Sequence, residues 1–294
     1  MPEYFESEKT NLLEAIRSLI NDKRDWADSR LLRALCDGEA YAVPRLGDEE
    51  TVDKLQALKV YTQYRDLIST APLEIIYSGS ADLERVKQAL AAAFATLPRE
   101  EVRVISTAAP HVCRESVQHV EDVLDVTQGK LGMGFSCGSD DMPALLMGNT
   151  LFGGSSNSKL FLNVREKLSL CYYASSLYHR QKGLITVSSG IEFQNYQRAY
   201  DEIMAQLEAV QKGELEDWEL EGARSTLLNS YATVGDSQGK LENFYLGQAA
   251  TGQHETPADL ARAIQDMTAE RICRAMSTVK LDTVYFLKGK EAEA

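Results

Sequence analysis

Two strand-like runs joined by a short turn constrain the fold of this chain most strongly. Residues 172–179 and 184–191 carry aromatic, β-branched and small side chains, and the four residues between them end in Gly183. Strands joined by so few residues pair in antiparallel order, because a parallel pair needs a much longer crossover. The sequence therefore predicts an antiparallel β-hairpin in this region.

A strand with glycines on one face is predicted at residues 130–136. Leu131, Met133 and Phe135 alternate along it and share one face. The glycines between them leave the other face without side chains, so another backbone or a ligand can approach closely. A further strand is predicted at residues 281–287.

Apolar residues at helical spacing predict that most of the remaining chain is α-helical. One more strand, at residues 73–77, is predicted among these helices. Because strands and helices do not alternate regularly, the predicted fold class is α+β. The predicted helices cover residues 6–22, 25–35, 49–67, 82–94, 142–151, 196–213, 216–234 and 238–251, and a stretch that begins at residue 256 and is interrupted near residue 268.

The composition excludes several classes of function. A formal charge of −13 and a pI near 4.9 argue against nucleic acid as a partner, since phosphate contacts need clustered Lys and Arg. No apolar run reaches the length of about 18 residues that a membrane helix needs, and the acidic first residues lack a signal-peptide core. Five single cysteines fit reduced thiols. We therefore expect a cytoplasmic protein that does not contact a membrane.

A charged, proline-containing segment at residues 97–103 is the predicted domain boundary. It separates a first domain, residues 1–98, from a second domain, residues 103–290.

Residues 153–172 are the most informative stretch of the sequence. Gly153 and Gly154 precede a run of small residues, an Arg-Glu-Lys sequence begins at Arg165, and Tyr172 follows that arginine by seven positions. This pattern resembles the pitrilysin/insulinase family of zinc peptidases, which includes mitochondrial-processing-peptidase-like chains. Weaker similarities, such as Glu8-Lys9 in the first helix and Thr256-Pro257, extend the resemblance over residues 4–288.

The resemblance implies two related units of mostly antiparallel sheet packed against helices, as in half of such a metallopeptidase. In active members the first unit holds an inverted zinc motif, H-x-x-E-H, in which two histidines bind zinc and the glutamate is the general base. The four histidines of this chain, at positions 111, 119, 179 and 254, form no such motif. Residues 1–98 are therefore expected to be an incomplete first unit, with no catalytic residues and no metal ligands.

The remaining zinc ligand of the family is also displaced. The resemblance implies two glutamates seven positions apart on the helix that begins like Glu8-Lys9. Position 15 is alanine, and Glu14 lies one place early, about 100° around the helix axis. The helix is interpreted as having lost its metal role, the alternative being that Glu14 reaches a metal after a small shift.

The resemblance assigns substrate binding to Arg165, Tyr172, Gly153 and Gly154. Arg165 and Tyr172 would face the cleft between the halves and hold a peptide carbonyl, and the glycines would form a mobile loop that touches substrate. The alternatives are a surface arginine, a half-buried strand tyrosine and a helix C-cap in which glycine adopts the left-handed conformation. Tyr173 is expected on the opposite face, in the core.

Three functions are consistent with the sequence. The leading hypothesis is a zinc-metallopeptidase-like protein that is inactive alone and contributes substrate-binding residues to a peptidase assembly. The alternatives are a truncated or separately encoded part of an active zinc endopeptidase, and an interaction domain without peptide binding. The expected partners are a peptide substrate and either a second copy in a homodimer or a catalytic zinc-peptidase chain. No cofactor is expected, since zinc would reside only in that partner or in a missing segment.

The absence of the two imidazole ligands predicts that the purified chain binds no stoichiometric zinc, because one carboxylate cannot hold the metal alone. Elemental analysis of the purified protein measures this. One zinc per chain would contradict the interpretation.

Overall fold

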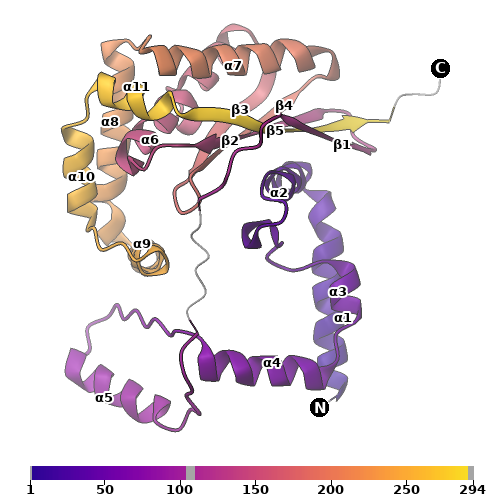
Figure 1. Ribbon diagram of the computed structural model, residues 1–294, viewed down its shortest axis with the longest axis vertical. Helices are drawn as coiled ribbons and strands as arrows, with labels where there is room; N and C mark the ends of the chain where they lie inside the picture. The colour runs from indigo at the N-terminus through magenta and orange to yellow at the C-terminus, as the bar shows by residue number, and fades with distance from the viewer. Residues whose placement is uncertain (1, 104–109, 291–294) are drawn as a thin grey trace. The chain divides into compact units, whose positions relative to one another are not determined.

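A computed structural model describes residues 2–103 and 110–290 (Figure 1). The chain forms two compact units that interleave along the sequence. The helical unit comprises Met1–Arg17, Leu46–Thr107 and Val234–His254, and the sheet unit comprises Ser18–Arg45, Ala108–Thr233 and Glu255–Ala294. That residues 1–98 and 103–290 correspond to two related family units stays a prediction, and Met1 and residues 104–109 of those ranges lie outside the described residues. No described helix is long and apolar enough to cross a membrane.

The predicted strand at residues 73–77 does not form. Residues 72–78 of the helical unit adopt no regular structure, and the side chains of Leu73, Ile75 and Tyr77 are exposed. A strand is stable only beside a hydrogen-bonded neighbour, and the described residues of this unit contain no other strand. The helices of this unit are α1 (Pro2–Ser18), α3 (Glu49–Asp53), α4 (Ala57–Thr70), α5 (Leu83–Phe94), the 3-10 turn Val234–Asp236 and α9 (Gln238–Thr251).

The sheet unit contains a five-stranded, mostly antiparallel sheet, which confirms the predicted α+β fold class. The strands lie in the order β1-β5-β2-β4-β3, and only β1 and β5 pair in parallel. The predicted hairpin is confirmed as β3 and β4, with Gly183 in the left-handed conformation at its turn. The bounds are β1 (Gln118–Leu124), β2 (Gly129–Cys137), β3 (Cys171–His179), β4 (Leu184–Ile191) and β5 (Val279–Gly289).

Helices cover both faces of this sheet, with α2 on one side and α6 and α7 on the other (Figure 1). Two π-helical segments, η3 and η4, lie between α6 and β3. The helical bounds are α2 (Lys23–Leu35), α6 (Met142–Asn149), η3 (Thr150–Gly154), η4 (Leu160–Lys167), α7 (Tyr196–Lys212), α8 (Asp217–Ala232), α10 (Pro257–Gln265) and α11 (Ala269–Met276), with 3-10 turns at Leu19–Asn21, Ala40–Ala42 and Phe193–Asn195.

The two faces of β2 determine this arrangement. Leu131, Met133 and Phe135 are buried in the main core, as the alternation predicted. On the opposite face, a Cβ built on Gly134 would lie 2.7 Å from Cδ2 of Leu35. A Cβ built on Gly132 would likewise lie 3.2 Å from Cδ2 of Leu31 in α2. The glycine face of β2 is therefore the surface on which α2 packs.

Polar contacts fasten α2 to the sheet. Arg30 donates two hydrogen bonds, of 2.8 and 3.2 Å, to the carboxylate of Asp122 on β1, which also accepts one of 2.8 Å from Tyr285. At the end of the helix, the Arg114 guanidinium donates to the carbonyls of Ala34 and Leu35. Both carbonyls lie in the last turn of α2, where the helix itself supplies fewer donors, and that of Ala34 also accepts from the backbone N–H of Asp37.

This packing predicts that Gly134→Val destabilises the protein by about 1–3 kcal/mol, because the added methyl groups overlap a fully buried leucine of α2. Chemical denaturation followed by circular dichroism measures the change. Gly222→Ala is the matched control within α8, where a Cβ makes only ordinary contact. It should stabilise the protein by about 0.5–1 kcal/mol through helix propensity. Equal stability of the two variants would contradict the account of α2.

Candidate functional site

The Gly153-Gly154 pair lies at the end of η3, packed against strand β3. Neither glycine has a positive φ, so the interpretation as a left-handed helix cap is wrong. Gly153 is buried, and a Cβ there would lie 2.8 Å from the backbone nitrogen of Ser176. The Ser176 hydroxyl also donates a 2.7 Å hydrogen bond to the Asn149 side chain at the end of α6. Glycine at 153 is thus required for close approach of η3 to the sheet.

Tyr172 occupies a β-bulge at the start of β3. Cys171 pairs with Ile191 and Tyr173 pairs with Gly190, so Tyr172 is the extra residue of the strand. A bulge re-aims a side chain, and that of Tyr172 is 59% exposed. Its hydroxyl donates to the carboxylate of Glu192, and this hydrogen bond together with the carboxylate charge raises the pKa of the Tyr172 phenol. The group is therefore a neutral hydroxyl at physiological pH.

Arg165 lies near the end of η4, where its guanidinium stacks on an aromatic ring. The guanidinium carbon lies 4.7 Å from the centroid of the Phe161 ring, and Nε lies 3.6 Å from the carboxylate of Glu166. The side chain is 41% exposed. The ring holds the charged group in place, and its donors remain accessible to a ligand.

Two pockets in the sheet unit share Arg165. The first, which we call the Tyr172 pocket, has a volume of about 460 Å³ and is lined by Tyr172, Glu166 and Glu192 besides the arginine. The second has a volume of about 390 Å³. We call it the serine pocket, because four serines line it together with Arg165, Gly153 and Gly154. The structure therefore brings all four sequence-predicted residues around two pockets, while their role in binding stays a prediction.

Arg24 and Tyr173 also line the serine pocket, and the sequence did not identify them as site residues. Tyr173 is half-buried in this pocket and not part of the core. The Arg24 guanidinium stacks 4.3 Å from its ring centroid and donates a 3.2 Å hydrogen bond to the Ser175 hydroxyl. Arg24 and Ser175 lie 151 positions apart in the sequence. The nearest sequence signal for this contact is the glycine face of β2, which allows α2 to lie on the sheet.

One group of possible metal ligands lies elsewhere in the sheet unit. Donor atoms of Cys36, Glu39 and His111 lie within 4.8 Å of one another. Lys182 forms an ion pair with Glu39, and His111 contacts the carboxylates of Glu39 and Asp282 at 2.5 and 3.2 Å. Burial raises the pKa of the Cys36 thiol to about 11, so the thiol is protonated at neutral pH. The charged partners of Glu39 and His111 thus lie within the protein itself.

The helix expected to carry the last zinc ligand is α1 of the helical unit. Glu8 and Glu14 are both exposed on it, and neither belongs to the group of possible metal ligands. The question of a metal role for Glu14 therefore rests on the sequence spacing alone.

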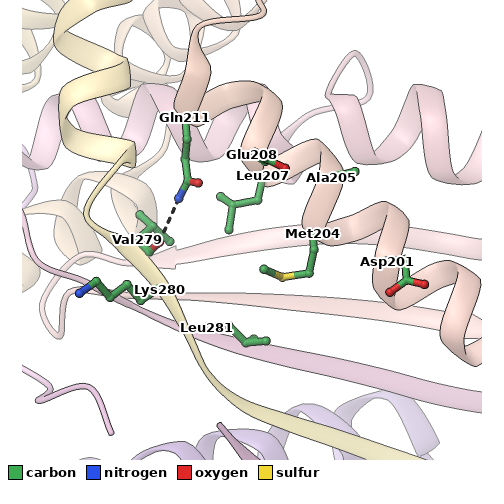
Figure 2. Close-up of a pocket in the computed structure, with 9 residues that line it drawn as sticks. All are labelled: Asp201, Met204, Ala205, Leu207, Glu208, Gln211, Val279, Lys280 and Leu281. Carbon is green, nitrogen blue, oxygen red and sulfur yellow. Dashed lines mark hydrogen bonds between the residues drawn. The ribbon is translucent and has the colours of Figure 1, made fainter. Parts of the chain in front are cut away.

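A third pocket, of about 520 Å³, lies between α7 and β5 (Figure 2). Gln211 projects across it and donates a 3.0 Å hydrogen bond to the carbonyl of Val279. The other labelled side chains combine two carboxylates, one lysine and several apolar groups. None of the predicted site residues lines this pocket. The candidate site is therefore the pair of pockets that share Arg165.

The family model described as the peptidase M16 inactive domain matches residues 54–227. The chain belongs to this family. Over 98% of its length it is 35% identical to the Bacillus subtilis protein named "Probable inactive metalloprotease YmfF", of which it spans 68%. The resemblance to the pitrilysin/insulinase zinc peptidases is thereby confirmed.

Solved structures support the same fold. A conserved protein from Enterococcus faecalis matches with a TM-score of 0.90 at 25% identity, covering 100% of this chain and 70% of that one. A peptidase M16 inactive domain from Pseudomonas fluorescens matches with a TM-score of 0.80 at 16% identity, covering 100% and 72%. The chain is thus a peptidase-like domain of the inactive type.

Proposed function

We propose that this domain holds an extended peptide and contributes that contact to a peptidase assembly without performing catalysis itself. The observation that carries the proposal is the convergence of Arg165, Tyr172, Gly153 and Gly154 on two pockets that share one guanidinium. A peptide that runs between the pockets would meet Arg165 at their common wall.

The chemistry of these groups suits binding. The Arg165 guanidinium can donate hydrogen bonds to peptide carbonyls, and it is held by Phe161 before any ligand arrives. The neutral hydroxyl of Tyr172 is exposed and can exchange its hydrogen bond to Glu192 for one to the peptide. The buried Gly153 fixes the pocket wall, so the site is formed in advance.

The same groups do not suit hydrolysis. Among the described residues that line the two pockets there is no histidine. Burial raises the pKa of the Cys171 thiol, which is the one cysteine among the lining residues and is therefore a poor nucleophile. In the proposed assembly, a metal-bearing partner activates the water molecule.

Arg165→Ala is expected to lower the affinity for a bound peptide by at least tenfold, because a hydrogen bond to a charged group contributes about 1.5–3 kcal/mol. Fluorescence anisotropy with a panel of short unstructured peptides measures this. Arg198→Ala removes an equal charge from an exposed position on α7 and should leave affinity unchanged. Equal binding by both variants, or no binding by the native chain, would refute the proposal.

The helical unit supports the assembly part of the proposal. On α4, the side chains of Leu58, Tyr61, Tyr64 and Leu67 are between 57% and 75% exposed. Clusters of exposed apolar side chains mark association surfaces. We propose that this face packs against a second copy of the chain or against a catalytic zinc-peptidase partner.

Light scattering should then give a mass above the 32.6 kDa of one chain at micromolar concentration, either for the chain alone or after a catalytic partner is added. Leu58→Glu with Tyr64→Lys should shift the mass toward the single chain, because burying unpaired charge opposes association. A single-chain mass under both conditions would count against the assembly.

A further inference from the structure

The serine pocket has a positively charged lining in a strongly acidic protein. Two guanidinium groups and the hydroxyl groups of four serines line it, and no carboxylate occurs among its lining residues. The chain as a whole has a formal charge of −13. The groups concerned are Arg24, Arg165, Ser155, Ser156, Ser175 and Ser176.

Aromatic rings hold both arginines in this pocket. Arg24 stacks on Tyr173, and Lys130 places a second cation 5.7 Å from the centroid of the same ring. Arg165 stacks on Phe161, which also lines the pocket. A guanidinium stacked on a ring keeps its in-plane N–H donors available for a planar anion.

The carboxylates near these arginines lie outside the pocket. Glu166, beside Arg165, lines the Tyr172 pocket only. The charge of Arg24 acts on the carboxyl groups of Asp22 and Asp28, and neither of these lines the pocket. Burial raises the pKa of the Asp28 carboxyl, and the hydrogen bond to Ser188 and the charge of Arg24 oppose this rise. The positive charges of the two arginines are therefore partly balanced by carboxyl groups next to the pocket. This balance favours a ligand with one negative charge over a ligand with two.

We propose that the serine pocket binds a carboxylate of an acidic peptide, either a Glu or Asp side chain or the C-terminal group. This inference rests on the proposed function, since the rest of the peptide would occupy the Tyr172 pocket on the other side of Arg165. Arg24 and Arg165 each present paired donors that match the two oxygens of a carboxylate. The hydroxyls of Ser156 and Ser175 can supply further donors, whereas those of Ser155 and Ser176 already donate to Thr150 and Asn149.

Peptide pairs test the carboxylate preference on the full chain. One pair differs only by Glu in place of Gln and has amidated ends, and the other lacks internal acids and differs only by a free or amidated C-terminus. In at least one pair, the acid should bind roughly tenfold tighter than its neutral match. The pair that shows the preference identifies the source of the carboxylate.

Arg24→Gln should abolish this preference, so that the acidic and neutral peptides of the pair bind with equal affinity. Arg33→Gln, an equal change at an exposed position on the same helix, should keep the preference. Circular dichroism melts of both variants verify folding.

Three results would overturn the inference. Peptides that bind without any acid preference in the native chain would refute the carboxylate site and leave the proposed function intact. A preference that survives Arg24→Gln would place the carboxylate elsewhere. Failure of every peptide to bind would refute the proposed function and the inference together.

Discussion

The packing of α2 on the glycine face of β2 is the contact on which the candidate site depends. A side chain at Gly134 would overlap Leu35 of α2 and one at Gly132 would crowd Leu31, because methyl groups of these leucines lie 2.7 and 3.2 Å from where a Cβ would be. The helix in turn carries Arg24 over Tyr173. The ion pair between Arg30 of this helix and Asp122 of β1 fixes the position of α2 along the helix axis. The glycines that let α2 pack on the sheet therefore also determine where Arg24 lies in the serine pocket.

A second close approach positions the opposite wall of the serine pocket. Gly153 lets η3 contact β3, and η4 then presents Arg165 near the end of its length. At the start of η4, Lys159 forms hydrogen bonds of 2.9 and 3.0 Å with Glu219 of α8, and both side chains are buried. Loss of one partner from such a pair costs about 3–5 kcal/mol. The position of Arg165 is therefore determined by packing that is independent of any ligand.

The sequence predicted the parts of this fold that depend on local patterns. The hairpin and the two faces of β2 follow from local spacing. The grouping of Arg165 with Tyr172 was implied by the family resemblance, and both residues line one pocket. Strand β1 was missed because Asp122 points inward to Arg30 and breaks the apolar alternation. Residues 73–77 were predicted as a strand from their composition, although strand formation depends on a neighbour that the described residues of the unit do not supply. Arg24 could not be predicted, since its contact is a product of tertiary packing.

The central claim is that the two pockets around Arg165 hold one peptide with its carboxylate in the serine pocket. A crystal structure of the chain with a bound acidic peptide tests it most directly. We expect a carboxylate within hydrogen-bond distance of Arg24 and Arg165, and peptide backbone beside Tyr172. A peptide seated at another surface, such as the pocket between α7 and β5, would contradict it.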